Sequence, residues 1–188
     1  MTEASRDESV AAQIRFPLEI RLEHDESDWT LVMRRRFPHT PARLWQMITE
    51  PELLARWSPV VPDRPLDSPG PATCREKPED EPLDAEVLIA DRPRKLVHRW
   101  DAEILSWTIT SGDDGTTLEL RQSLGDHPRA SQYAAGWHLC LARLAVEDDG
   151  FDHERVVGGR AWAYGCGDLI ERYRDVLGSD ADDVHPQR

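Results

Sequence analysis

The chain has 188 residues, enough for one domain with a substantial core and few for two. Its 36 acidic and 23 basic residues give a net charge of -13, and its longest basic run is Arg34–Arg36. We therefore do not expect a basic surface that binds the phosphates of a nucleic acid. Residues 1–10 lack the apolar core of a secretory signal, and no run of about 18 apolar residues predicts a membrane span.

The two ends of the chain differ from its middle. Residues 1–13 predict a disordered leader and residues 179–188 a disordered tail, because both are rich in charge and poor in apolar periodicity. Residues 14–178 are expected to form a single domain. Apolar residues alternate with charged ones over 18–22 and again over 29–33, which is typical of a β-hairpin.

Two short helices are expected next. Thr40 supplies a capping hydroxyl, and Pro41 stands in the first turn, where no amide hydrogen is needed. An apolar stripe then runs over two turns to Ile48. Pro51 ends this helix and opens a shorter one that carries Trp57.

Residues 58–82 carry seven prolines and little periodicity, so this stretch is expected to be mostly loop, with one edge strand at 72–75. Short apolar alternations separated by turn residues follow at 83–89, 96–100, 105–109 and 116–123. Short strands joined by tight turns predict an antiparallel sheet, here of six or seven strands.

After Pro128 the apolar residues no longer alternate but recur at intervals of three or four residues. This pattern predicts a long helix that ends near Glu147 and packs one broad apolar stripe on the sheet. A last apolar pattern over 162–177 stops at Gly178, a residue suited to a left-handed helix cap. We expect this second helix to lie at the periphery, outside the curved sheet.

Several motifs carry a resemblance to a known family. They are the stretches 37–45, 49–57, 93–100, 115–120 and 135–141. In their order and content they resemble the SRPBCC (START-like, Bet v 1-like) superfamily, in the actinobacterial branch of the activator of Hsp90 ATPase homologue 1-like family. The resemblance covers residues 14–178 and departs at Cys166, where a tryptophan is expected.

The resemblance implies an α+β helix-grip (START-like) fold: a curved antiparallel sheet around a long C-terminal helix, with two short helices after the first strands. It also implies a cavity between sheet and helix. Three functions follow as alternatives: non-catalytic binding of a small apolar or aromatic molecule, a polyketide cyclase or dehydratase-like enzyme, and a co-chaperone-like activator of an ATPase. Binding is the function we expect, with a homodimer or a chaperone partner left open.

The candidate ligand-binding residues stand on the elements that surround such a cavity. They are Trp57, His98, Trp100, Trp107, Tyr133 and Trp137. Taken singly, each large ring is suited to core packing, and only together do they indicate an aromatic-lined pocket. Strand alternation puts His98 on the core face, where it is either a structural hydrogen-bonded imidazole or an anchor or base for a ligand.

No catalytic residue, metal site or cofactor is expected. His138 and Cys140 are two apart, so on a helix they point about 200° apart, and a structural zinc needs four converging ligands. With Cys74 and Cys166, the cysteines are odd in number and have no Cys-x-x-Cys pair. That usage is typical of a reducing compartment and predicts a cytoplasmic protein.

Overall fold

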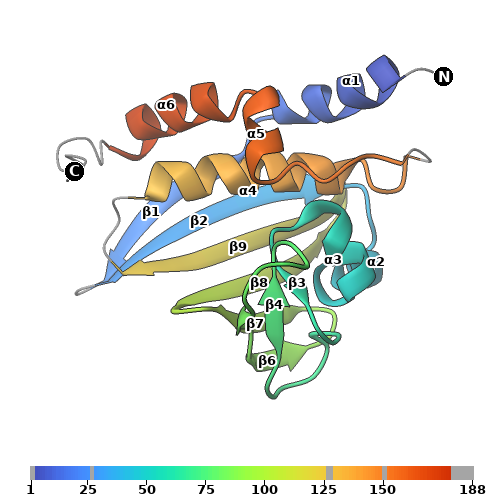
Figure 1. The fold of residues 1–188 in the computed structure, drawn as a ribbon, viewed down its shortest axis with the longest axis vertical. Coiled ribbons are helices and arrows are strands. Elements are labelled where there is room, and N and C mark those ends of the chain that lie inside the picture. The colour runs from blue at the N-terminus through green and yellow to red at the C-terminus, as the bar shows by residue number, and fades with distance from the viewer. Residues whose placement is uncertain (1–2, 26–27, 126–128, 150–151, 179–188) are drawn as a thin grey trace.

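The computed structural model describes residues 3–25, 28–125, 129–149 and 152–178, and has an α+β architecture (Figure 1). Within this part of the chain, six strands form one antiparallel sheet in the order β1-β2-β9-β8-β7-β6. Their bounds are Glu19–Asp25 (β1), Asp28–Phe37 (β2), Val87–Asp91 (β6), Lys95–Trp100 (β7), Glu103–Gly112 (β8) and Gly115–Gly125 (β9). The predicted antiparallel sheet is confirmed.

The helices occupy one side of this sheet. Their bounds are Glu3–Ile14 (α1), Pro41–Thr49 (α2), Pro51–Trp57 (α3), Ala130–Ala145 (α4), Gly159–Ala163 (α5) and Cys166–Leu177 (α6). Figure 1 shows α4 lying along the sheet, with α1 and α6 in a further layer above it. The predicted long helix is confirmed, although Pro128 lies outside the described residues.

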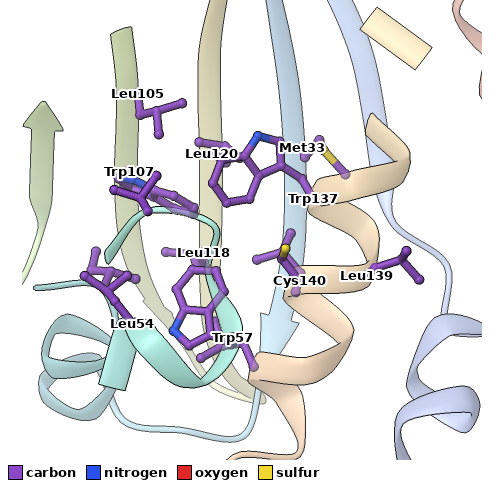
Figure 2. Packing of buried hydrophobic residues seen from close by; sticks show 14 of the residues in the cluster. Met33, Leu54, Trp57, Leu105, Trp107, Leu118, Leu120, Trp137, Leu139 and Cys140 are labelled. Carbon is purple, nitrogen blue, oxygen red and sulfur yellow. The ribbon is translucent and has the colours of Figure 1, made fainter. Parts of the chain in front are cut away.

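The core lies between the sheet and α4. Alternation along each strand turns every second residue inward, as Leu118 and Leu120 do in β9 and Leu105 and Trp107 do in β8. Figure 2 shows these side chains facing those of α4. Inward residues from neighbouring strands therefore form one contiguous hydrophobic core with the helix stripe.

The start of the chain differs from the prediction. A disordered leader was expected over residues 1–13, but Glu3–Ile14 form α1, which packs against α4. Val10 is only 1 % exposed. At the end of α1, Arg35 of β2 donates to the Gln13 carbonyl oxygen at 3.3 Å and to the Gln13 side-chain oxygen at 2.5 Å. The prediction was wrong because α1 is stabilised by contacts with residues distant in the sequence, and local periodicity does not reveal such contacts.

The two short helices have the expected ends. Thr40 Oγ1 accepts a hydrogen bond from the amide of Arg43 at 3.2 Å, which caps α2. Trp57, the last residue of α3, is buried and donates its indole N–H to the Met47 carbonyl oxygen at 3.0 Å. This bond ties α3 to α2, so Trp57 is fixed where the helices meet the sheet.

The proline-rich segment contains more strand than was predicted. Within the described residues it forms a small sheet in the order β3-β4-β5, with bounds Val61–Pro62, Thr73–Arg75 and Leu83–Asp84. The strand expected at 72–75 is thus central rather than at an edge. The strand expected over 83–89 divides after β5, because Asp84 Oδ1 accepts from the Glu86 amide at 2.9 Å and bends the chain toward β6.

α6 lies outside the curved sheet, as predicted, and covers the outer side of α4 together with α1. Twelve of the sixteen residues of α4 are buried as a result. The predicted tail, residues 179–188, lies outside the described residues. No helix in the described ranges is long and apolar enough to cross a lipid bilayer.

Candidate functional site

Aromatic rings form a continuous chain between the sheet and α4. Trp57 meets Trp107 edge to face with ring centroids 6.0 Å apart, and Trp107 meets Trp137 at 5.4 Å. Trp137 contacts Trp100 at 5.7 Å, and Trp100 contacts Tyr133 at 6.1 Å. Such edge-to-face arrangements are favoured by the ring quadrupoles. The structure therefore brings together the five aromatic residues that the sequence predicted.

His98 adjoins this chain, and both of its ring nitrogens have partners. Nδ1 lies 2.8 Å from the Arg99 carbonyl oxygen, which can only accept, so Nδ1 carries the hydrogen. Nε2 accepts the indole N–H of Trp107 at 3.2 Å. Burial lowers the pKa of His98 to about 4, which keeps the ring neutral. With no lone pair left for a substrate proton, the geometry favours the structural role over that of a base.

A second group of polar contacts links α4 to the sheet. The indole N–H of Trp137 donates to Gln122 Oε1 at 2.7 Å, and Gln122 in turn donates to the carboxylate of Glu103. Tyr133 donates its hydroxyl to the same carboxylate at 2.6 Å. Burial, aided by Glu103, raises the pKa of Tyr133 to about 12, so the phenol stays protonated. Two α4 rings are thus held at fixed orientations.

Sequence reasoning missed Gln122 and Glu103. The signal for Gln122 was present, because it stands at an inward position of β9, in register with Leu118 and Leu120. A polar side chain in an apolar register needs a buried partner. The partner, Glu103, stands on the neighbouring strand β8, and the alternation of residues along β9 does not identify it.

Where the aromatic chain ends, a hollow of about 150 Å³ remains beside α4. Its helix side is formed by Gln132, Tyr133, Gly136, Trp137 and Cys140, and Trp100 of β7 also lines it. At Gly136 an added Cβ would meet no atom within 4 Å, so the helix surface is bare there. A glycine inside a helix is less favourable than alanine by about 1 kcal/mol. A glycine within the predicted long helix was therefore the feature of the sequence that could have indicated a special role for Gly136.

A second hollow, of about 270 Å³, is also lined by Trp100 and Tyr133. Its lining adds Glu103 and Arg129 to those two rings. The two hollows therefore adjoin at Trp100 and Tyr133.

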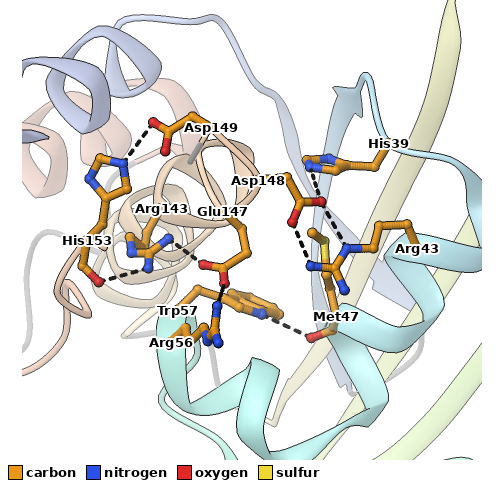
Figure 3. A network of polar contacts seen from close by, with 10 residues as sticks. All are labelled: His39, Arg43, Met47, Arg56, Trp57, Arg143, Glu147, Asp148, Asp149 and His153. Carbon is orange, nitrogen blue, oxygen red and sulfur yellow. Dashed lines mark hydrogen bonds and ion pairs between the residues drawn. The ribbon is translucent and has the colours of Figure 1, made fainter. Parts of the chain in front are cut away.

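The chain segment opposite α4 is held by an ion-pair network around the buried side chains of Arg143 and Glu147, shown in Figure 3. Arg143 pairs with Glu147 at 2.7 Å and donates to the His153 carbonyl oxygen at 2.8 Å. Arg56 of α3 pairs with the other oxygen of Glu147 at 2.6 Å. These contacts anchor residues 153–158, whose last three residues line the first hollow. The hollow thus has a fixed wall on each side.

His138 and Cys140 point to different surroundings. His138 Nδ1 lies 2.5 Å from the Tyr173 hydroxyl of α6, whereas Cys140 lines the hollow. Burial raises the pKa of Cys140 to about 12, which leaves a thiol rather than a nucleophilic thiolate. Among the described residues, no group of three or more His, Cys, Asp or Glu side chains is arranged to hold a metal ion. Cys166, where relatives were expected to carry tryptophan, is buried at the start of α6.

The curved antiparallel sheet, the long helix along it and the hollow at their junction define a protein of the helix-grip class. Residues 38–147, more than half of the chain, match the family described as "Activator of Hsp90 ATPase homolog 1-like protein". The chain belongs to this family, and the resemblance stated from the sequence is confirmed. A search of curated proteins finds no match.

Solved structures share the fold. CalU16 from Micromonospora echinospora is 16% identical, with 87% of this chain and 98% of that chain covered and a TM-score of 0.63. EF2215 from Enterococcus faecalis, a conserved protein of unknown function, is 20% identical, with 94% and 99% covered and a TM-score of 0.62. DynU16, a protein in the dynemicin biosynthetic locus, is 20% identical, with 70% and 51% covered and a TM-score of 0.59. These likenesses show the fold alone.

Proposed function

We propose that this protein binds a small apolar or aromatic molecule in the hollow over Gly136, without catalysing a reaction on it. The observation that carries the proposal is an aromatic-walled space at a point where the helix has no side chain. Trp100, Tyr133 and Trp137 supply that wall. Ligand sites are typically concave and apolar with few polar groups, and this hollow has that character.

The volume sets the size of the ligand. A cavity of about 150 Å³ holds a benzene-sized molecule, whereas drug-sized ligands need roughly 300 Å³ or more. A larger ligand has to extend beyond this space, and Trp100 and Tyr133, which also line the second hollow of about 270 Å³, stand where the two hollows adjoin. We therefore expect benzene-sized ligands to fit within the first hollow.

The enzyme alternative has less support. DynU16 is placed in a biosynthetic locus by its description, but at 20% identity the likeness shows the fold alone. A cyclase or dehydratase needs an acid or base free to exchange a proton with the substrate. His98 is occupied by Arg99 and Trp107, and Tyr133 is held by Glu103. The co-chaperone alternative follows from the family description, and no contact described above favours it.

The test fills the hollow and removes none of its contacts. Gly136→Leu projects a side chain into the space, and Gly136→Ala is the matched control that adds one methyl group where nothing is within 4 Å. Both should fold with unchanged or higher melting temperature, because glycine is the poorer helix former by about 1 kcal/mol. Binding of benzyl alcohol is measured by the indole N–H cross-peaks in nitrogen-15 correlation spectra.

In the wild type, benzyl alcohol should shift the cross-peaks of Trp100 and Trp137 in a saturable way. Gly136→Leu should weaken this binding at least about tenfold, the equivalent of about 1.4 kcal/mol, and Gly136→Ala should weaken it less. Equal affinity in the wild type and Gly136→Leu would place the ligand elsewhere and refute the proposal.

A further inference from the structure

The first hollow has one charged residue in its lining, and that residue is acidic. Glu76 follows β4 and reaches the hollow opposite α4. A Cβ added at Gly158, which also lines the hollow, would lie 3.1 Å from Glu76 Oε1, so the carboxylate itself stands at this wall. The hollow therefore combines aromatic rings with a single negative charge.

The Glu76 carboxylate has no counter-ion of its own. Among the described residues it makes no ion pair or hydrogen bond, although the side chain is half-buried. The nearby Arg155 guanidinium donates to the carbonyl oxygens of Ser58 and Glu76, and within the described ranges it pairs with no carboxylate. The Glu76 carboxylate is therefore not held in an ion pair at this wall.

Basic groups also stand beside Glu76. Arg75, Lys77 and Arg155 line a hollow of about 280 Å³, and Glu76 lines this hollow as well as the first one. Over residues 76–86, however, six acidic side chains accompany one basic side chain, and the whole chain carries a net charge of -13. The negative charge of this segment and of the whole chain favours the approach of a cation.

Aromatic walls and a carboxylate together recognise organic ammonium groups. A cation over the face of tryptophan or tyrosine is attracted by the ring quadrupole, and this is the basis of the aromatic cages that bind choline and methylated lysine. The walls here supply Trp100, Tyr133 and Trp137, and Glu76 supplies the charge.

We infer that the ligand of this hollow is a compact organic cation, an ammonium group with apolar substituents, held by Glu76 against the aromatic wall. The inference rests on the proposed function and names the chemical class of its ligand. It excludes small anions from this site and ranks a neutral molecule below an ammonium of the same shape.

The test compares choline with 3,3-dimethylbutan-1-ol, which has the same shape with carbon in place of the charged nitrogen. Affinities are measured by the same indole cross-peaks in the wild type, in Glu76→Gln and in Glu79→Gln. Glu79 is the matched control, because it is exposed in the same turn and its replacement removes the same charge. Because the affinities for choline and for the neutral alcohol are compared within the same variant, a change in the stability of that variant does not affect their ratio.

Choline should bind the wild type and Glu79→Gln roughly fivefold to thirtyfold more tightly than the neutral alcohol. In Glu76→Gln the ratio should fall to about one, with the affinity for the alcohol unchanged. Equal binding of both molecules to the wild type would overturn this inference and leave apolar binding intact. A preference that survives in Glu76→Gln would also overturn it, and no binding of either molecule would refute the proposed function as well.

Discussion

Replacing His98 with glutamine should remove a pH dependence of stability that the buried imidazole creates. The ring is 2 % exposed, and its pKa in the folded protein is about 4, against about 6.5 in an unfolded chain. Above pH 6.5 neither the folded nor the unfolded state binds a proton at His98, so the free energy of unfolding is not reduced by this residue. As the pH falls from 6.5 to 4, the unfolded state binds the proton first, and stability is lost.

The magnitude follows from these two pKa values. Linkage gives a loss of about 2 kcal/mol at pH 5 and about 3 kcal/mol at pH 4. His138, whose pKa burial also lowers to about 4, adds a loss in the same direction. Because His138 is present in both proteins, the difference between the wild type and His98→Gln isolates the contribution of His98.

The assay is urea unfolding of the wild type, His98→Gln and the exposed-site control His24→Gln at pH 7, 6 and 5. Glutamine retains an oxygen that can accept the Trp107 N–H, so His98→Gln should fold. Between pH 7 and pH 5 the wild type and the control should lose about 2 kcal/mol more than His98→Gln. Equal losses in all three would show that a charged His98 is tolerated, and the interpretation of His98 as a base would regain support.

Three further predictions concern packing, the first helix and chemistry. Trp137→Ala should lower the free energy of unfolding by about 3–5 kcal/mol. Although the ring also lines the hollow, it is 2 % exposed, packs edge to face on Trp100 and Trp107 and donates to Gln122; a loss under about 1 kcal/mol in urea titration would contradict that packing. Val10→Ala should cost about 1.6 kcal/mol for two buried methylene equivalents, whereas an unchanged midpoint, like that expected of the exposed control Glu8→Ala, would mean that α1 does not dock. The purified chain should contain no stoichiometric zinc by elemental analysis and should not hydrolyse ATP; one metal per chain or sustained turnover would refute this.

The strands and the long helix could be predicted because their periodicities are strong and agree with their environment. Residues such as Leu118 and Leu120 alternate inward, and the α4 stripe recurs at helical spacing. α1 could not be predicted, because its docking depends on burial of Val10 and on the hydrogen bonds between Gln13 and Arg35. Such contacts join segments far apart in the sequence, and a short local pattern does not contain them.

The candidate site divides in the same way. The inward registers of Trp100 and Trp107 were predictable from alternation, and so was their meeting with the helix stripe. The role of His98 was not, because the face of a strand is set by register whereas hydrogen-bond partners are set by side-chain packing. Glu76 escaped notice because it stands in a proline-rich segment with little periodicity, and it reaches the hollow only through the small sheet.

The most direct test of the proposed binding site is an anomalous diffraction measurement on crystals of the protein soaked in bromobenzene. We predict a bromine peak in the hollow between Gly136 and the ring of Trp100, with the peak absent from crystals of Gly136→Leu soaked in the same way. Bromine peaks only outside this hollow, or a peak of equal height in Gly136→Leu, would contradict the assignment of this space as the ligand site.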